Sequence, residues 1–364
     1  TTGANNVAVG ESALYAGTDG SGKVAIGYHA LKTATDGSYQ IAIGFEAMKS
    51  TTTGTGNTMI GFRSGHNHTT GIRNTALGYS ALYSITEGAR NTAIGYNACS
   101  SITDGGHDNT AVGYGALTWN NNGDNNTAVG SSALINNTTG GANTALGHNT
   151  LSTNTTGANN VAIGDTSLED NTTGAANVSI GVIALRDNTT GSGNVGIGYQ
   201  ALNLNTTASF NVGIGYQALS TTTTATGNTA VGAEALRLAT TGGTNSAFGN
   251  GALRATTTGT HNSSFGYQAL YANTTGQSCV GVGNYSLYSN TTASDNTALG
   301  YQALYATTTG AANTAVGNEA LVSNTTASNN VAVGNEALKL NTTGHSNNAF
   351  GTLALDANTT GNQN

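Results

Sequence analysis

A glycine that recurs every 17 residues constrains the fold more than any other feature of the sequence. It follows a large apolar residue, as in "AVG" or "AIG", and runs from Gly10 through Gly27 and Gly44 to Gly351. The twenty-one anchor glycines are 17 residues apart throughout, except for one step of 18 between Gly95 and Gly113. A fixed short period is typical of a solenoid, in which each repeat stacks on the next. The sequence therefore predicts a single continuous repeat domain over residues 1–364, with a one-residue insertion between Gly95 and Gly113.

Each repeat is too short for a pair of helices, and turn-forming residues interrupt it every six to eight positions. We therefore expect an all-β fold, a parallel β-solenoid with 21 rungs of 17 residues. Only 7% of the 364 residues are charged, and Asn, Thr and Ser supply the polarity instead. The net charge of −7 shows no basic cluster, and no apolar run approaches the ~18 residues that span a bilayer. Neither a nucleic-acid partner nor a membrane span is predicted in this segment.

Positions in the repeat are named here as columns, counted from the anchor glycine. Column −1 is always large and apolar, column −3 is mostly Val, Thr or Ile, and column +4 is nearly always Leu, as in Leu31 and Leu304. These three columns are predicted to form the core. Five steps separate columns −1 and +4, and a strand cannot place such a pair on one face. We therefore expect the chain to bend at the glycine and form two short strands per rung.

Column −2 holds small side chains in nearly every rung, mostly alanine. By strand alternation it is expected to face outward, where a strip of small residues would let another backbone approach closely. The sequence therefore predicts a subunit-interface strip and a side-by-side homotrimer. The strip comprises Ala8, Ala25, Ala42, Ala128, Ala162, Ala315 and Ala332.

Column −4 is asparagine in 18 of the 21 rungs, with Lys23, Gln40 and Cys279 as the exceptions. Identical amides stacked one rung apart can bond to each other along the solenoid axis and satisfy buried polar groups. We predict a structural Asn ladder, which includes Asn57, Asn74, Asn91, Asn109, Asn126, Asn143, Asn160, Asn177 and Asn194.

Column +1 is aromatic in six consecutive rungs and again in four later ones. These residues are Tyr28, Phe45, Phe62, Tyr79, Tyr96, Tyr114, Tyr199, Tyr216, Tyr267 and Tyr301. Two interpretations stay open at this point. The rings either stack between rungs or pack on a neighbouring subunit, or they form a stripe that contacts a carbohydrate or another surface. The exposure of the rings would separate the two.

No catalytic or metal site is predicted. Cys99 and Cys279 lie eleven rungs apart, beyond disulfide reach, and the seven histidines do not share a column. No spacing of a nucleophile and a base stands out, so the chain is expected to be no enzyme and to need no cofactor. The recurring "NTT" fits the N-glycosylation pattern, but turn formation by Asn explains it more simply.

The rung "NNVAIG" at residues 159–164, with the related "NVSIG", "NVGIG" and "NTAVG", resembles the head repeat of trimeric autotransporter adhesins of the YadA type. The "GYQAL…NTTG" half is similar to repeats of phage tail fibres, and the resemblance covers essentially the whole chain. It implies a left-handed β-roll, three chains side by side, and an extracellular role in attachment on a cell surface or virion. The repeat here is longer than the family's usual one, and the sequence shows neither a stalk coiled coil nor a membrane anchor.

These observations predict a non-catalytic extracellular fibre segment, an adhesin head or shaft or a tail-fibre-like rod, that presents a surface to a host or to a glycan. The chain is expected to be a mature or excerpted piece of a longer product. An alternative is a subunit that polymerises end to end into a filament, because both ends stop in mid-pattern without a polar cap. A third is a solenoid that binds glycan or ice, for which regular rows of Thr would order water.

Overall fold

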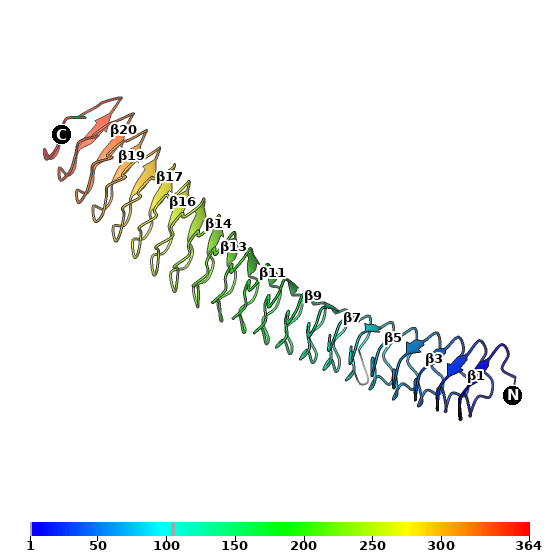
Figure 1. The fold of residues 1–364 in the computed structure, drawn as a ribbon. Helices are drawn as coiled ribbons and strands as arrows, with labels where there is room; N and C mark the ends of the chain where they lie inside the picture. Colours follow the sequence, from blue (N-terminus) through cyan, green and yellow to red (C-terminus); the bar gives the residue numbers. More distant parts are fainter. Residues whose placement is uncertain (1, 103–105) are drawn as a thin grey trace. The chain divides into compact units, whose positions relative to one another are not determined.

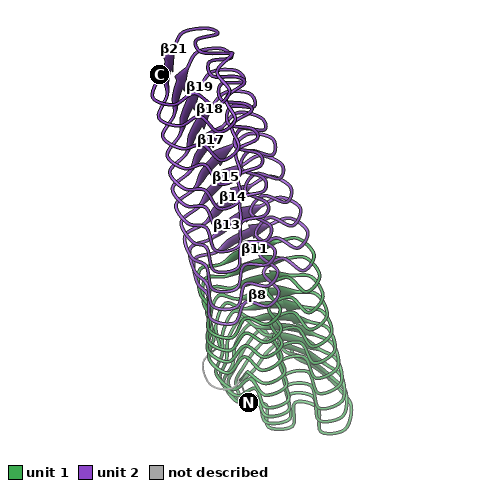
Figure 2. Cartoon of the chain, turned by 90° about the vertical axis from the view of Figure 1, so that its left-hand side faces the viewer, with its two compact units in different colours: residues 1–182 green, residues 183–364 purple. Residues whose placement is uncertain are grey.

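The computed structural model describes residues 2–102 and 106–364. These residues contain no helix, and their twenty-one strands are each three residues long and occupy columns −3 to −1. The chain groups into two compact units, residues 1–182 and 183–364 (Figure 2). Each unit is a parallel β-solenoid with one strand per turn (Figure 1). The predicted fold class is therefore confirmed.

The first unit holds β1 (Val7–Val9), β2 (Val24–Ile26), β3 (Ile41–Ile43), β4 (Thr58–Ile60), β5 (Thr75–Leu77), β6 (Thr92–Ile94), β7 (Thr110–Val112), β8 (Thr127–Val129), β9 (Thr144–Leu146), β10 (Val161–Ile163) and β11 (Val178–Ile180). The second unit holds β12 (Val195–Ile197), β13 (Val212–Ile214), β14 (Thr229–Val231), β15 (Ser246–Phe248), β16 (Ser263–Phe265), β17 (Val280–Val282), β18 (Thr297–Leu299), β19 (Thr314–Val316), β20 (Val331–Val333) and β21 (Asn348–Phe350).

Within each unit, strands that follow one another in the sequence pair in parallel and in register. Ala128 of β8 pairs with Ala145 of β9, for example, 17 residues further on. Between β6 and β7 the offset is 18, so that Thr92 pairs with Thr110. The extra residue is thus absorbed before β7 and every column keeps its place. Part of this step, residues 103–105, lies outside the described residues.

The second half of each rung is not a strand. From the anchor glycine onward the chain forms turns, and it still bonds to the neighbouring rung through its backbone, as where Leu134 N–H donates to Thr150 O at 3.0 Å. The prediction of two strands per rung was wrong. Columns +2 and +4 both have positive φ, 58° at Ser132 and 52° at Leu134, and this conformation is incompatible with a strand.

The predicted bend at the anchor glycine is confirmed. Gly215, for example, has a φ of 131°, which side chains disfavour, and the next rung leaves no room for one. A Cβ at Gly215 would lie 2.6 Å from the carbonyl oxygen of Gly232. Conformation and close stacking both require glycine in this column.

The strands face the opposite way from the prediction. Their central residue, in column −2, is buried in every rung after the first, while columns −3 and −1 are exposed or half-buried throughout. Leu77 and Leu299 of column −1 are 49% and 47% exposed. The interior is too narrow for large side chains from both sides of the rung. In column −2, a Cβ on Gly213 would already lie 3.2 Å from the Leu202 side chain.

One exceptional rung shows how closely columns −2 and +4 are coupled. Column −2 carries Met59 instead of a small residue, and in the same rung column +4 carries Gly65 instead of Leu. A Cβ on Gly65 would overlap the sulfur of Met59, which is itself fully buried. The methionine therefore fills, from the strand, the space that leucine fills elsewhere from the turn. Total core volume is conserved, as close packing requires.

The Leu column +4 lies in the core as predicted, and Leu31, Leu134 and Leu304 are fully buried. Two further buried columns were missed by the sequence reasoning. Column +3 is mostly alanine, and column +7 varies from Ala34 through His68 to the Asn of "NTT". Column +7 was missed because it mixes apolar and polar residues and so carries no hydrophobic pattern.

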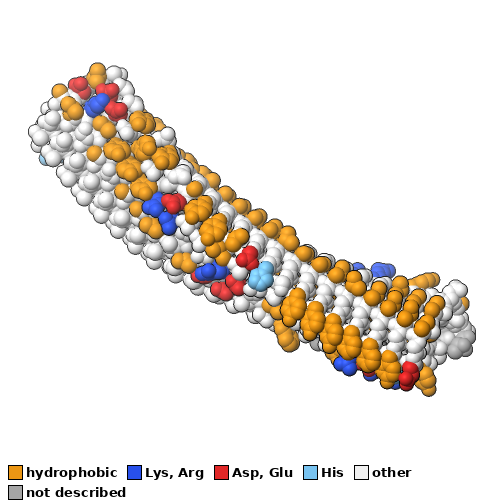
Figure 3. Space-filling model, in the orientation of Figure 1, with side chains coloured by type: hydrophobic (Ala, Val, Ile, Leu, Met, Phe, Trp, Pro, Cys, Tyr) orange, Lys and Arg blue, Asp and Glu red, His pale blue; other side chains and the backbone are white. Residues whose placement is uncertain are grey.

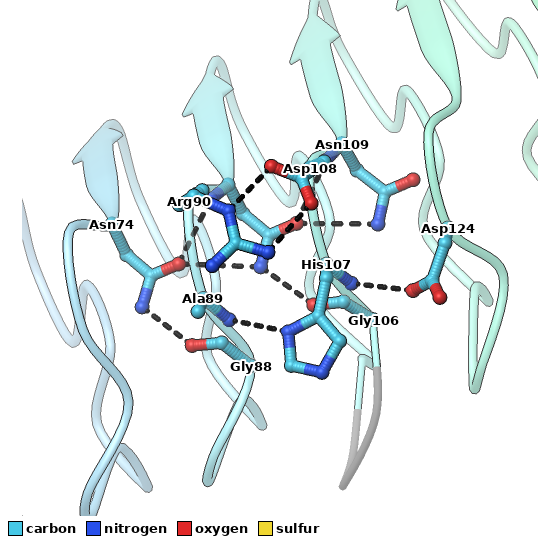
Figure 4. Close-up of polar contacts among 10 residues, drawn as sticks. Asn74, Gly88, Ala89, Arg90, Gly106, His107, Asp108, Asn109 and Asp124 are labelled. Carbon is cyan, nitrogen blue, oxygen red and sulfur yellow. Dashed lines mark hydrogen bonds and ion pairs between the residues drawn. The ribbon is translucent and has the colours of Figure 1, made fainter.

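The predicted Asn ladder is present in both units, and its members are buried. In one example, the N–H of Asn91 donates to Asn74 Oδ1 at 3.0 Å, and Asn91 Nδ2 donates to Gly106 O at 2.7 Å (Figure 4). Each side chain therefore accepts from the next rung and donates to a turn carbonyl. Two of the residues that replace asparagine in this column also supply a donor to a turn carbonyl. Lys23 Nζ donates to Thr35 O at 3.0 Å, and Cys279 Sγ lies 3.3 Å from Ala293 O.

The Asn residues of "NTT", in column +7, form a second ladder. Asn154 Nδ2 donates to Asn137 Oδ1 at 2.8 Å and also to Gly157 O at 3.0 Å. Because these amide nitrogens are buried and bonded, they are closed to a glycan in the folded chain. Nine of the ten "NTT" asparagines are fully buried: Asn137, Asn154, Asn171, Asn188, Asn205, Asn273, Asn290, Asn324 and Asn341. Turn formation alone is therefore an incomplete explanation of the pattern.

Candidate functional site

The column +1 aromatics of the first unit form one continuous stack. Successive ring centroids from Tyr28 to Tyr114 are 5.1, 5.2, 4.9, 5.0 and 5.3 Å apart, with interplanar angles of 14° or less. Parallel pairing holds these side chains one strand spacing apart, which is close to a stacking distance. The interpretation that the rings stack between rungs is confirmed for this run.

The stack remains accessible along its length, because its six rings are between 37% and 62% exposed. What the rings expose are their edges, since each interior ring face is covered by the ring of the next rung. A sugar that stacks on an aromatic ring needs an open face. The ladder is therefore a poor platform for stacking saccharides and a better one for broad contact with another apolar surface.

The second unit carries the remaining predicted aromatics in shorter groups. Tyr199 and Tyr216 stack with centroids 5.7 Å apart. Tyr267 and Tyr301 do not stack on each other, because Tyr285 from the intervening rung meets both edge-on, at 5.3 and 6.3 Å. A separate stack in column +5, Tyr271, Tyr288 and Tyr305, lies beside Tyr285 and was not predicted.

The strand residues of columns −3 and −1 form an outward strip in each unit, in which column −1 is apolar in every rung and column −3 is Val or Ile in some rungs and Thr, Ser or Asn in the others. In column −1 the most exposed members away from the chain ends are Leu77 (49%), Leu299 (47%), Leu146 (46%) and Phe265 (42%). Figure 3 shows the hydrophobic side chains running in rows along each unit. A continuous row of large apolar side chains is unusual on a free surface and is typical of an interface.

The predicted subunit-interface strip was placed on the wrong face. Ala25, Ala42, Ala128, Ala162, Ala315 and Ala332 are fully buried inside their own coil and cannot contact another chain. Ala8, in the first rung, is exposed. The outward-facing strand residues are instead those of columns −3 and −1, of which column −1 is large and apolar in every rung.

The Thr pairs of "NTT" do not offer two free rows of hydroxyls. In column +8, Thr138 Oγ1 donates to Thr155 O at 2.9 Å, and Thr155 Oγ1 donates to Thr172 O at 3.0 Å. These hydroxyls bond along the solenoid axis to the backbone, so they are not available to order water. Only the second Thr of each pair, such as Thr139, is exposed.

Charged side chains gather mainly around Glu46 in the first unit. Its Oε1 lies 2.7 Å from Lys49 Nζ, and its Oε2 lies 3.0 Å from Arg63 Nε and 3.3 Å from His66 Nε2. The hydrogen bond from Lys49 holds the pKa of the Glu46 carboxyl below its usual value, assisted by Arg63. The carboxylate therefore stays charged and binds three basic groups together across two rungs.

Over residues 2–102 and 106–364, no group of three or more His, Cys, Asp or Glu side chains is arranged to hold a metal ion. The same residues include no helix long and apolar enough to cross a membrane. Cys99 and Cys279 are both buried as free thiols. Burial raises the pKa of both, that of Cys279 to about 11.

No protein-family model matches this chain, and no curated protein matches it either.

Proposed function

We propose that the chain is a non-catalytic fibre segment that acts outside the cell, on a cell surface or virion, and presents a surface for attachment. It associates side by side with copies of itself, as the homotrimer that the sequence resemblance implies. The resemblance to adhesin heads and tail fibres supports the setting. The geometry supports the assembly.

The observation that carries this proposal is the outward apolar row of column −1. Burial of apolar surface contributes roughly 25 cal/mol per Å², so a row of half-exposed Val, Ile, Leu and Phe gains free energy when it is covered. The row is uncharged and continues in register from strand to strand, so an identical row on a second copy is complementary to it in chemistry. A second copy is therefore the occupant that fits it best.

The association is tested with a double substitution, Leu77→Glu and Ile94→Glu, in which both side chains point outward from adjacent strands. The variant is expected to fold and to sediment as a monomer, whereas the parent forms a defined oligomer. Thr139→Glu, an exposed turn position in another rung, is the control for added charge and should assemble like the parent. A parent that is monomeric at micromolar concentration would contradict the proposal. Long unbranched filaments in electron micrographs would favour end-to-end polymerisation instead.

A further inference from the structure

A pocket of about 250 Å³ lies in the first unit, on the turn side of rungs four to six. Its walls come from columns +2, +5 and +6. They comprise Arg63 of rung four, Ser80, Tyr83 and Ser84 of rung five, and Asn97, Ser100 and Ser101 of rung six.

The pocket exists because column +5 changes from large side chains, His66 and Tyr83, to a small one, Ser100, in the next rung. His66 and Tyr83 stack with centroids 5.1 Å apart and an interplanar angle of 11°, which covers one face of the tyrosine. The next member of the column, Ser100, is too small to cover the other face. The ladder of column +1 has no such gap in this region. One face of the Tyr83 ring therefore borders the pocket.

The other walls are polar and have unused hydrogen-bonding capacity. Within the described part of the chain, the hydroxyls of Ser80, Ser84 and Ser100 and the amide of Asn97 make no hydrogen bond. All four side chains are half-buried. Donors and acceptors thus surround an aromatic face, and this combination suits a ligand with an apolar face and many hydroxyls.

The rim of the pocket carries one basic side chain, Arg63. Arg63 bonds through Nε to Glu46, and no described residue accepts from its two terminal nitrogens. Its guanidinium carbon lies 5.2 Å from the centre of the Phe62 ring, and the side chain is 42% exposed. Arg63 is the charged residue among those that line the pocket, and its two terminal nitrogens stay available beside the ion pair that Nε makes with Glu46. The rim therefore favours an anionic group.

We propose that this serine pocket binds one acidic sugar residue of a surface glycan. The sugar ring lies against the open face of Tyr83, its hydroxyls bond to the serines and Asn97, and its carboxylate pairs with the terminal nitrogens of Arg63. This inference rests on the proposed attachment function and names the class of ligand that it would engage. A simple inorganic anion would not use the ring face.

Binding is measured with D-glucuronate and D-glucose as probes, by saturation-transfer NMR and by titration to ~10 mM, a range suited to a weak single-sugar site. We expect glucuronate to bind and glucose to bind at least tenfold more weakly, because a charged hydrogen bond adds about 1.5–3 kcal/mol. Arg63→Gln should reduce glucuronate binding to the level of glucose. Arg73→Gln removes the same charge from an exposed residue outside the pocket and should change nothing.

The aromatic face is tested separately. Ser100→Tyr extends the His66–Tyr83 stack over the open face, and Tyr83→Ile removes the ring while keeping a side chain that column +5 already carries at Ile135. Both should abolish binding of either sugar. Failure of one variant to fold leaves the other as the test. Absence of binding by the folded parent, full competition by sulfate, or unchanged binding in a folded Ser100→Tyr or Tyr83→Ile variant would overturn the proposal. The oligomer measured by sedimentation is independent of all three results, so the assembly proposal stands or falls by itself.

Discussion

Asn143 offers the most direct test of how the solenoid satisfies its buried backbone. Its side chain is fully buried, and Oδ1 accepts from the N–H of Asn160 at 3.0 Å and from Asn160 Nδ2 at 3.1 Å. Its Nδ2 donates to Gly157 O at 2.9 Å. Substitution Asn143→Ala removes all of these bonds at once. The Asn160 N–H then remains buried without its partner, whereas the Gly157 carbonyl still accepts from Asn154 Nδ2.

A buried polar group that loses its partner costs about 1–3 kcal/mol, so the unpaired Asn160 N–H predicts a loss of about 2 kcal/mol. The free energy of unfolding from urea titration, followed by circular dichroism, measures it. The control is Thr139→Ala, a nearby exposed position whose side chain makes no bond among the described residues, and its effect should stay within about 0.5 kcal/mol.

Asn143→Asp separates the two roles of the amide, because it keeps the acceptor and loses the donor. Burial disfavours the charged carboxylate, so the folded pKa should rise above its ordinary value of about 3.9. The folded state then binds the proton more tightly, and the stability of this variant should increase as the pH falls below neutral. Equal stability of Asn143→Ala and Thr139→Ala would refute the ladder as a source of stability.

Three further predictions concern single columns. Burial lowers the pKa of His68 from about 6.5 to about 4. The unfolded state therefore binds the proton more tightly than the folded state does. The free energy of unfolding should fall by about 3 kcal/mol as the pH drops from 6.5 to 4. His68→Asn, the commonest residue of that column, should remove this part of the acid sensitivity, and urea titrations at several pH values measure it. Gly215→Ala combines a φ of 131° with a clash against Gly232 O and should cost about 3 kcal/mol or more, seen as a shift of the urea midpoint. Cys99 and Cys279 are buried thiols whose pKa is raised, so iodoacetamide should label neither until urea unfolds the chain. Mass spectrometry measures the labelling, and rapid labelling of the native protein would contradict their placement.

The spacing of the repeat was sufficient to predict the class of fold. A glycine every 17 residues, with too few residues for helices between, is compatible with stacked rungs and little else. The Asn ladder followed from the same logic. In a buried column of identical amides, such as Asn74 and Asn91, each side chain meets its equivalent one rung away and can bond to it.

The candidate site was predicted less well. The stacking of Tyr79 and Tyr96 followed from their shared column. The serine pocket was not predicted, because it depends on the face of the Tyr83 ring that the small side chain of Ser100 leaves uncovered. The change from large to small residues along a column is visible in the sequence. It becomes a pocket only when neighbouring columns are brought to one face by the turn.

The sequence by itself determined the 17-residue period, the stacking of rungs and the side chains that meet along the solenoid axis, because all of these depend only on residues one repeat apart. The tertiary structure decided which side of each strand faces inward. Strand alternation allows either the central residue or its two neighbours to face inward. The large apolar side chain of Ile94 favoured the inward placement of column −1, but the small Ala93 of column −2 is the residue that is buried. The width of the coil selects the other, since Leu from the turn already fills the interior. The pair Met59 and Gly65 was the sign of this in the sequence, and its meaning depends on the contact that folding creates.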